Sequence, residues 1–314
     1  MPVPFFRATR SVADNFTKIS TFLAATQCSF WNTRLEVSGF SASVNGAPET
    51  LLHQRFVSGS SIQGVNISEA FVRNDSTYER NNLANLLLFT VIASYEGFLA
   101  EIVPGCGGTG AQIEQMQLSN RGPSGHSRFG ILDALASFRP HRDPDMVKAF
   151  QANLRSNPRY SLTALNNQMI EYRLFKEIRN TMMHNRGIAD ARVVRAYSAV
   201  SAITASDLGV KEVPQMVPLI LGNPVAPTLR SVIGLGDIIL RVAASIDAEL
   251  AVTRGGTEEL LSRWQSAYGA SRNLPGNKVK RGATVRRLVK NIGFPTPDDP
   301  DAVYRILRRK AIVL

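Results

Sequence analysis

The sequence predicts a mainly α-helical protein, an antiparallel helical bundle that carries small β-hairpin insertions and a basic C-terminal module. Apolar residues recur every three or four positions over several long segments, which is the period of a helix with one buried face. Segments rich in Gly, Ser and Pro separate these stretches and are expected to be loops. Helices joined in this order pack most simply as antiparallel neighbours around one core.

The N-terminal part is expected to contain one helix and a short hairpin. Residues 4–32 have apolar side chains at helical spacing. Residues 35–44 alternate between apolar and polar side chains, and Asn45-Gly46 follows them, which predicts a two-stranded turn. Residues 57–80 are rich in Ser, Asn and Gly and are expected to form a loop.

The strongest apolar segment predicts a long helix over residues 83–103. Asn81 or Asn82 is expected to cap its start, and Pro104-Gly105 to end it. The Gly-rich segment 104–127 is then expected to be a connecting loop.

Further helices follow along the chain. Short helices are expected over 128–138 and 143–155, and a longer one from Ser161 or Thr163 to Arg186.

Beyond Arg186, residues 191–204 and 228–253 predict two more helices. Between them, residues 210–221 alternate weakly around two prolines and predict a small hairpin or an extended insert.

The segment 271–314 differs from the rest of the chain by its charge. It holds eleven Lys and Arg against three Asp, a net charge of +8 out of the chain's +11. Two short helices are expected in it, after a linker near residues 269–276. Seven of its basic side chains are expected to bind the phosphates of a polyanionic partner, which the motif described below identifies as RNA: Lys278, Lys280, Arg281, Arg286, Arg287, Arg308 and Arg309. The alternative is that the segment caps the bundle, with Val285, Leu288 and Ile306 buried against it.

Composition narrows the class of protein. A net charge of +11 and 44% hydrophobic residues favour a folded protein with a polyanionic partner. Two distant cysteines fit a reducing cytoplasm, and four scattered histidines predict neither a zinc site nor another cofactor. The longest apolar run, residues 86–93, is too short to cross a bilayer, so no membrane partner is expected.

The most informative segment is residues 177–187, Glu-Ile-Arg-Asn-Thr-Met-Met-His-Asn-Arg-Gly. It places Arg179, Asn180 and His184 within six positions at the end of a predicted helix, which Gly187 stops. Arg is a permanent cation that binds phosphate through two donors, and His exchanges protons near neutral pH. These are the groups that cleavage of RNA without a metal requires.

Spacing alone is not specific, because Arg121 and His126 repeat it within a loop. The motif with Asn180 in an amphipathic helix, Arg-Asn-x-x-x-His, resembles the Arg-polar-x(4–6)-His motif of the HEPN superfamily. These are small helical-bundle domains of RNase toxins, RNA-guided effectors and phage-defence proteins. Residues 86–102 resemble their long first helix, which often carries an acidic residue, here Glu96. The resemblance covers about residues 80–255.

This resemblance implies an endoribonuclease, a toxin or antiviral defence effector that forms a homodimer and has an antitoxin or defence-system partner. The 2′-OH of RNA would attack the phosphate and leave a 2′,3′-cyclic phosphate and a 5′-OH end. His184 is the candidate acid or base, and Arg179 is the candidate to stabilise the developing phosphate charge. Asn180 is the candidate to orient the imidazole or to hold a phosphate oxygen. Glu96 is expected either to neutralise Arg179 and set its rotamer or to face solvent, and Arg186 to be a solvated charge or a second phosphate contact.

Arg179 and His184 lie five positions apart, about 140° around an ideal helix, so a single straight helix does not aim both at one ligand. Two copies of the motif meeting across a two-fold axis would remove this difficulty, as the composite dimer sites of the HEPN superfamily do. The structural alternative is that Arg179 pairs with an acid such as Glu96, while His184 caps the last helix carbonyls. The chain would then be a non-catalytic nucleic-acid-binding or scaffold subunit, or an interaction platform for an active partner chain.

Three regions follow from these predictions. Residues 1–80 are expected to form an N-terminal helix with an irregular, short-strand region. Residues 81–255 are expected to form the helical bundle, and residues 256–314 the basic helical module.

Overall fold

The computed structural model describes residues 3–60, 64–121, 129–269 and 272–313. These residues form helices and connecting segments, and they contain isolated β-bridges but no β-strand. The predicted all-α character is therefore confirmed. The hairpins expected within residues 35–46 and 210–221 are not formed.

The first predicted hairpin is replaced by the continuation of one long helix, α1 (Arg7–Ser43). Val37 is fully buried, and Phe40 packs beside it, three positions along the helix. Asn45 and Gly46 both have positive φ, 55° and 87°, and the Gly46 N–H donates to the Ser41 carbonyl at 2.9 Å. A left-handed pair ends a helix as readily as it turns a hairpin, which is why the sequence signal was ambiguous.

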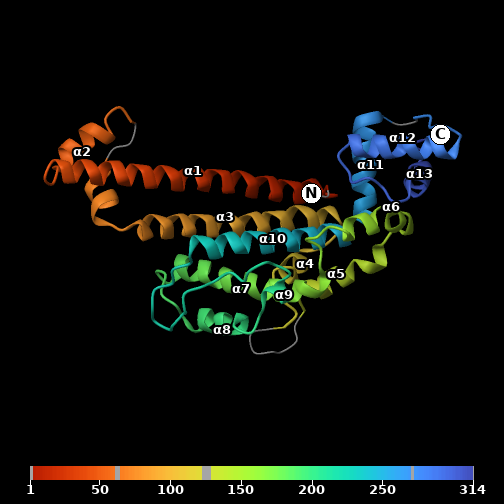
Figure 1. Ribbon diagram of the computed structural model, residues 1–314. Helices are drawn as coiled ribbons and strands as arrows, with labels where there is room; N and C mark the ends of the chain where they lie inside the picture. Colours follow the sequence, from red (N-terminus) through yellow and green to blue (C-terminus); the bar gives the residue numbers. More distant parts are fainter. Residues whose placement is uncertain (1–2, 61–63, 122–128, 270–271, 314) are drawn as a thin grey trace.

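Beyond α1 the chain folds back through a small separate apolar cluster. It contains α2 (Glu49–Phe56) and the π-helical turn η1 (Glu69–Arg73), so the region 57–80 is not wholly loop. Figure 1 places α2 at one end of α1 and the chain's N-terminus at the other. The helix pair α1 and α3 (Ser76–Gly105) thus forms an arm that carries this cluster at its tip.

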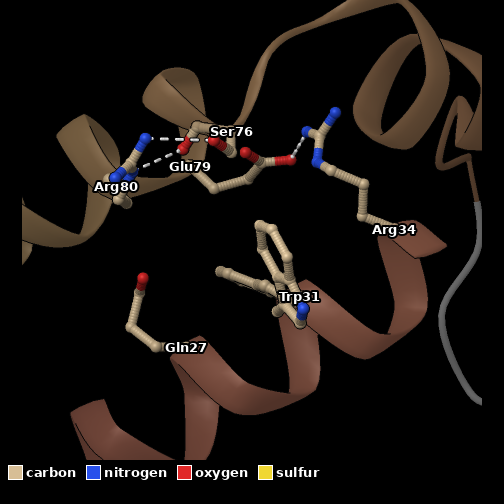
Figure 2. A pocket seen from close by; sticks show the side chains of 7 residues that line it. Gln27, Trp31, Arg34, Ser76, Glu79 and Arg80 are labelled. Atoms are coloured by element: carbon tan, nitrogen blue, oxygen red, sulfur yellow. Dashed lines mark hydrogen bonds and ion pairs between the residues drawn. The ribbon is translucent and has the colours of Figure 1, made fainter.

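Where α1 meets the start of α3, a pocket of about 130 Å³ lies between them (Figure 2). Arg34 of α1 forms an ion pair with Glu79 of α3 and donates to the Ala70 carbonyl at 3.1 Å. Trp31, 60% exposed, lines the same pocket. Arg34 therefore fixes the arm near its tip and binds η1 at the same time.

α3 begins earlier than the sequence predicts, because Asp75 and not Asn81 or Asn82 caps it. The Asp75 carboxylate accepts from the Thr77 N–H at 2.6 Å. Pro104 lies in the last turn, close to the predicted end. By length and composition α3 could cross a bilayer, and half of its most apolar window is buried inside the protein.

The bundle is built from three helices in contact, α3, α7 (Leu162–His184) and α10 (Leu229–Leu250). Figure 1 shows α10 between α3 and α7, with α8 on the far side of α7. Shorter elements complete this region: α4 (Gly110–Gln115), α5 (Ile131–Ser137), η2 (Arg139–His141), α6 (Pro144–Arg155), α8 (Ala191–Val200) and α9 (Ala205–Leu208). Residues 210–221 run without regular structure before α10, so of the two predicted forms the extended insert is found.

A buried carboxylate ties the start of α1 to α10. Asp247 accepts from the N–H groups of Phe5 at 2.8 Å and Phe6 at 3.0 Å, and from the Thr9 hydroxyl at 2.6 Å. The two N–H groups belong to the residues just before α1, and the Thr9 hydroxyl belongs to its first turn. Burial raises the pKa of Asp247 to about 6, and the three hydrogen bonds oppose that rise.

The C-terminal segment packs against the bundle through α11 (Arg254–Tyr268), α12 (Lys278–Asn291) and α13 (Pro300–Arg309). The two short helices predicted after residue 271 are present. Val285, Leu288 and Ile306 are buried in the same apolar core as the bundle. The tail is therefore packed onto the bundle, as the structural alternative for these three residues requires.

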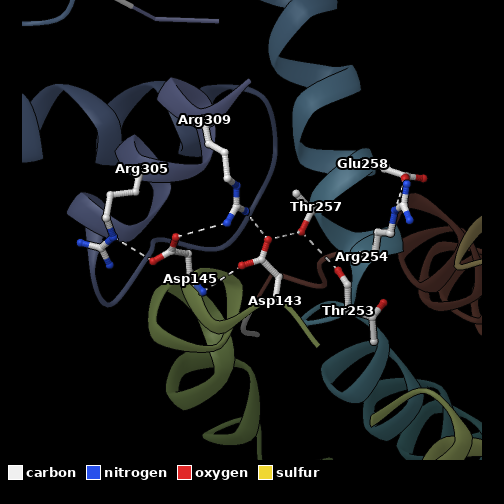
Figure 3. Close-up of polar contacts among 8 residues, drawn as sticks. All are labelled: Asp143, Asp145, Thr253, Arg254, Thr257, Glu258, Arg305 and Arg309. Atoms are coloured by element: carbon white, nitrogen blue, oxygen red, sulfur yellow. Dashed lines mark hydrogen bonds and ion pairs between the residues drawn. The ribbon is translucent and has the colours of Figure 1, made fainter. Parts of the chain in front are cut away.

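Polar contacts fix α13 to α6 (Figure 3). Arg305 Nε lies 2.8 Å from Asp145 Oδ1, and Arg309 forms an ion pair with Asp143. Asp143 also accepts from the Thr257 hydroxyl of α11 at 3.2 Å. One carboxylate at the start of α6 thus joins three helices.

Candidate functional site

The helix that carries the motif has one buried face and a capped start. Ser161 is the cap, as expected, and its hydroxyl accepts from the Ala164 N–H at 3.1 Å. Of the six apolar positions that predict the helix, Met182 is partly buried and five are fully buried: Leu165, Met169, Tyr172, Phe175 and Ile178. This face packs into the bundle core and fixes the rotation of α7, and so the direction in which each motif residue points.

The helix ends at His184, two residues before the predicted end. Arg186 and Gly187 follow with positive φ, 51° and 72°. The N–H groups of Asn185 and Gly187 both donate to the Thr181 carbonyl, at 2.8 and 3.1 Å. The backbone therefore satisfies this carbonyl itself, and His184 is not the group that caps it.

Arg179 is held by Glu96 of α3, which is one of the two arrangements open to Glu96 and is the pairing that the structural alternative requires. Arg179 Nη2 lies 3.1 and 3.2 Å from the two Glu96 carboxyl oxygens. Both side chains are partly exposed, at 23% and 33%. The guanidinium is therefore oriented at the surface, with its remaining donors open to a further acceptor.

His184 and Asn180 do not join this ion pair. His184 is exposed, Asn180 is half-buried, and neither side chain has a hydrogen-bond partner among the described residues. Because α7 is an uninterrupted helix through both positions, the offset of about 140° between Arg179 and His184 is retained. The fold of one chain thus brings Arg179 and Glu96 together and leaves His184 apart from them.

Arg186 lies just beyond the helix and is exposed. Its left-handed backbone is unusual for a residue with a Cβ, and it directs the chain away from the α7 axis. Arg186 has no ion-pair partner within the described parts of the chain. The side chain is free to reach solvent or a ligand.

Two residues of α7 that matter here were missed from the sequence. Lys176 Nζ lies 2.9 Å from Glu96 Oε1, so one carboxylate faces two cations. Its position one turn before Arg179 was the available signal. Glu171 is 1% exposed, and neither of its carboxyl oxygens has a hydrogen-bond partner among the described residues. Burial raises the pKa of Glu171 to about 8.

The seven basic residues predicted to bind RNA fall into two groups. Lys278 and Arg281 both lie near Asp301, at 3.2 and 3.4 Å, and Arg309 pairs with Asp143. The other members are exposed and have no ion-pair partner in the part of the chain that the structure describes: Lys280, Arg286, Arg287 and Arg308. The second group is therefore the better placed for phosphates, because its charge is not offset locally.

Comparison with known proteins does not assign this site to a family. Neither the protein-family models, nor the curated proteins, nor the solved structures gave a match to the chain. Among the described residues, no three His, Cys, Asp or Glu side chains gather as a metal site. His126, in the loop copy of the Arg-x4-His spacing, lies outside the described residues.

Proposed function

We propose that this protein is a metal-independent endoribonuclease of the HEPN type, acting as a toxin or an antiviral defence effector. The observation that carries the proposal is the end of α7. There a surface guanidinium, Arg179, is oriented by Glu96, and an exposed His184 follows on the same helix. An oriented cation and a solvent-accessible imidazole are the two groups that attack by the 2′-OH of RNA requires.

In the proposed reaction His184 either takes the proton of the 2′-OH or gives a proton to the leaving 5′-oxygen, and water exchanges the other proton. Arg179 donates to the phosphate oxygens as negative charge develops on them. The bond from phosphorus to the 5′-oxygen breaks as the bond to the 2′-oxygen forms. The products are a 2′,3′-cyclic phosphate and a 5′-OH end. Asn180, half-buried between the two, is proposed to orient the imidazole or a phosphate oxygen.

The separation of Arg179 from His184 supports an active site made by two copies of the chain. One phosphate would take Arg179 from one protomer and His184 from its partner. Met183, 60% exposed beside His184, supplies apolar surface for such an isologous contact. The end of α7 is proposed to lie at the two-fold axis.

A second function is favoured by the same ion pair. Glu96 offsets the charge of Arg179, and Lys176 competes for the same carboxylate. A chain whose Arg179 serves only to hold α7 against α3 would bind nucleic acid, or act as a scaffold for a partner, without cutting. The two functions differ in whether the protein cleaves RNA and in whether that cleavage requires His184.

The test is cleavage of RNA by the pure protein in EDTA, with mass spectrometry of the RNA ends. His184→Ala and Arg179→Ala are each expected to lower the cleavage rate by about a hundredfold or more, the usual effect of a catalytic acid or base. His141→Ala is the matched control, because His141 is also exposed but lies on η2. Thermal unfolding of each variant checks that the fold is kept.

Cleavage that requires Mg²⁺, or products with 5′-phosphate ends, would contradict the mechanism. Full cleavage by His184→Ala would contradict the role of His184, and RNA binding without cleavage by the wild-type protein would support the scaffold function. A mixture of the Arg179→Ala and His184→Ala proteins tests the composite site. Half of the dimers would then be mixed and would keep one intact site, so the mixture should recover about one quarter of the wild-type rate. No recovery would refute a site shared between protomers.

A further inference from the structure

A second site is present in the fold, away from the end of α7. A cavity of about 420 Å³ lies where the start of α1, the middle of α10 and the end of α12 meet. Its volume falls within the range of small-molecule sites. None of the residues that line it belongs to α7 or α3, so it is separate from the site proposed for RNA cleavage.

The floor of this cavity is apolar. Ala243 of α10 and Phe294, just after α12, are each 1% exposed and form part of it. Pro4 and Leu240 complete the same surface, and Val3, 44% exposed, lies at its edge. Small alanines on α10 leave room above the helix for a flat or apolar group.

The polar side chains around the cavity are mostly cations. Arg10, Arg159 and Lys290 line it, against the single carboxylate of Asp14. Arg10 is oriented by a hydrogen bond to the Gly293 carbonyl at 2.5 Å, and Arg159 Nε lies 3.9 Å from Asp237. Lys290 is exposed, at the end of α12, and makes no ion pair with the described residues.

A neighbouring cavity has the opposite charge. It has a similar volume, about 440 Å³, and lies between α1, α3 and α11. There three carboxylates, Glu101, Glu258 and Glu259, face one cation, Arg7. A phosphate group would be repelled from that cavity and attracted to the one beside α12, because the sign of the local charge decides where an anion binds.

We propose that the cavity beside α12 binds a phosphate ester that carries a planar or apolar group, the class to which nucleotides belong. The apolar floor would hold the planar part, and Lys290, Arg159 and Arg10 would neutralise the phosphate charges. The three cations still outnumber Asp14 and Asp237, the two carboxylates near them, which favours a phosphate over a fatty acid. The ligand is either a free nucleotide or one nucleotide of an RNA strand. This proposal does not depend on RNA cleavage.

The test is calorimetric titration of the full-length protein with AMP, adenosine and inorganic phosphate as separate probes. AMP is expected to bind with a millimolar or tighter Kd, and adenosine and phosphate at least about tenfold more weakly, since each lacks one half of the ligand. Lys290→Gln is expected to weaken AMP binding by about tenfold or more. Lys148→Gln, an exposed lysine on α6 outside the cavity, removes the same charge and should change the Kd by less than about twofold.

A second variant, Val3→Glu, puts a negative charge at the rim without entering the core and should also weaken AMP binding. The proposal is overturned if AMP does not bind at millimolar concentration, if phosphate alone binds as tightly as AMP, or if Lys148→Gln weakens binding as much as Lys290→Gln. His184→Ala should bind AMP like the wild type, which separates this site from the proposed nuclease. The same variant is used to identify the natural ligand, because it is not expected to cut RNA. If an oligoribonucleotide displaces AMP from it, the ligand is a nucleotide of an RNA strand; if it does not, the ligand is a free nucleotide.

Discussion

Replacing Glu171 by Gln should remove most of a pH dependence of stability that originates inside α7. Glu171 is buried in the helix that carries the motif, and its carboxyl oxygens have no hydrogen-bond partner among the described residues. Burial raises its pKa from 4.5 to about 8. At neutral pH the folded protein therefore keeps this carboxyl protonated, whereas the unfolded chain has released the proton.

The direction of the effect follows from this difference. Below pH 4.5 the carboxyl is neutral in both states and does not change stability with pH. As pH rises from 4.5 to about 8, the unfolded state loses its proton first, so the free energy of unfolding falls. Each pH unit in that window corresponds to about 1.36 kcal/mol, so the fall between pH 5 and pH 9 is roughly 4 kcal/mol.

The assay is urea unfolding of wild-type and Glu171→Gln protein at a series of pH values from 5 to 9. Gln has the same shape and no proton to release, so the variant should lose the Glu171 part of the dependence. The difference in unfolding free energy between the two proteins should grow by roughly 4 kcal/mol towards pH 9 in favour of the variant. Other titrating groups contribute equally to both proteins and cancel. Two parallel curves would refute the reasoning, because Glu171 would then be solvated or paired in the folded state.

Two further predictions concern stability and RNA affinity. Asp247→Ala should lower the unfolding free energy by about 2–4 kcal/mol, because it leaves the buried N–H groups of Phe5 and Phe6 without an acceptor, and urea unfolding measures this loss. Replacing both Arg286 and Arg287 by Gln should reduce the slope of log RNA affinity against log salt by up to about 1.4, at about 0.7 per lost phosphate contact. Arg305→Gln is the control, since Asp145 already offsets its charge, and an equal slope change in both proteins would contradict the assignment.

The sequence predicted the helices where apolar spacing and a capping residue agree. Ser161, one of the two caps expected for α7, caps that helix, and α6 begins beside Asp143, where the sequence predicts a helix to start. The region after residue 32 could not be assigned in the same way. Alternation over so short a segment fits a strand, and only the packing of Val37 against the tip cluster favours the helix.

Of the candidate site, the sequence offered the pair between Arg179 and Glu96 as one alternative beside a Glu96 that faces solvent, and the structure has the pair. The sequence did not predict that Lys176 also pairs with Glu96, because the distance between α3 and α7 is set by the core and not by the motif. The sequence of one chain likewise does not show whether Arg179 and His184 act together. It depends on a surface of a second copy, which no pattern within α7 specifies.

The packing of the tail changes how its role has to be tested. Removing residues 271–314 would take Val285, Leu288 and Ile306 out of the core and expose the surfaces that they cover. A truncated protein would then lose stability whether or not the tail binds RNA. Substitutions of the exposed arginines separate the two roles, because they change the charge and leave the apolar face in place.

The two ends of α7 are held very differently, and this difference bears on both proposed functions. Its start is capped by Ser161, and its middle is fixed by the Gln168 amide, which donates to the Leu208 carbonyl at 2.8 Å, and by the Arg179 pair with Glu96. After Arg179 the buried Thr181 and the partly buried Met182 still pack against the core, and backbone hydrogen bonds to the Thr181 carbonyl close the helix. Met183 and His184, the last two residues of the helix, are exposed. A guanidinium that is fixed in advance reorganises little when charge develops on a phosphate, whereas an imidazole at a helix end can move towards a partner. A scaffold would require only the first of these features. In the proposed nuclease, the exposed His184 and the exposed Met183 beside it would contact a second molecule, RNA or another copy of the chain.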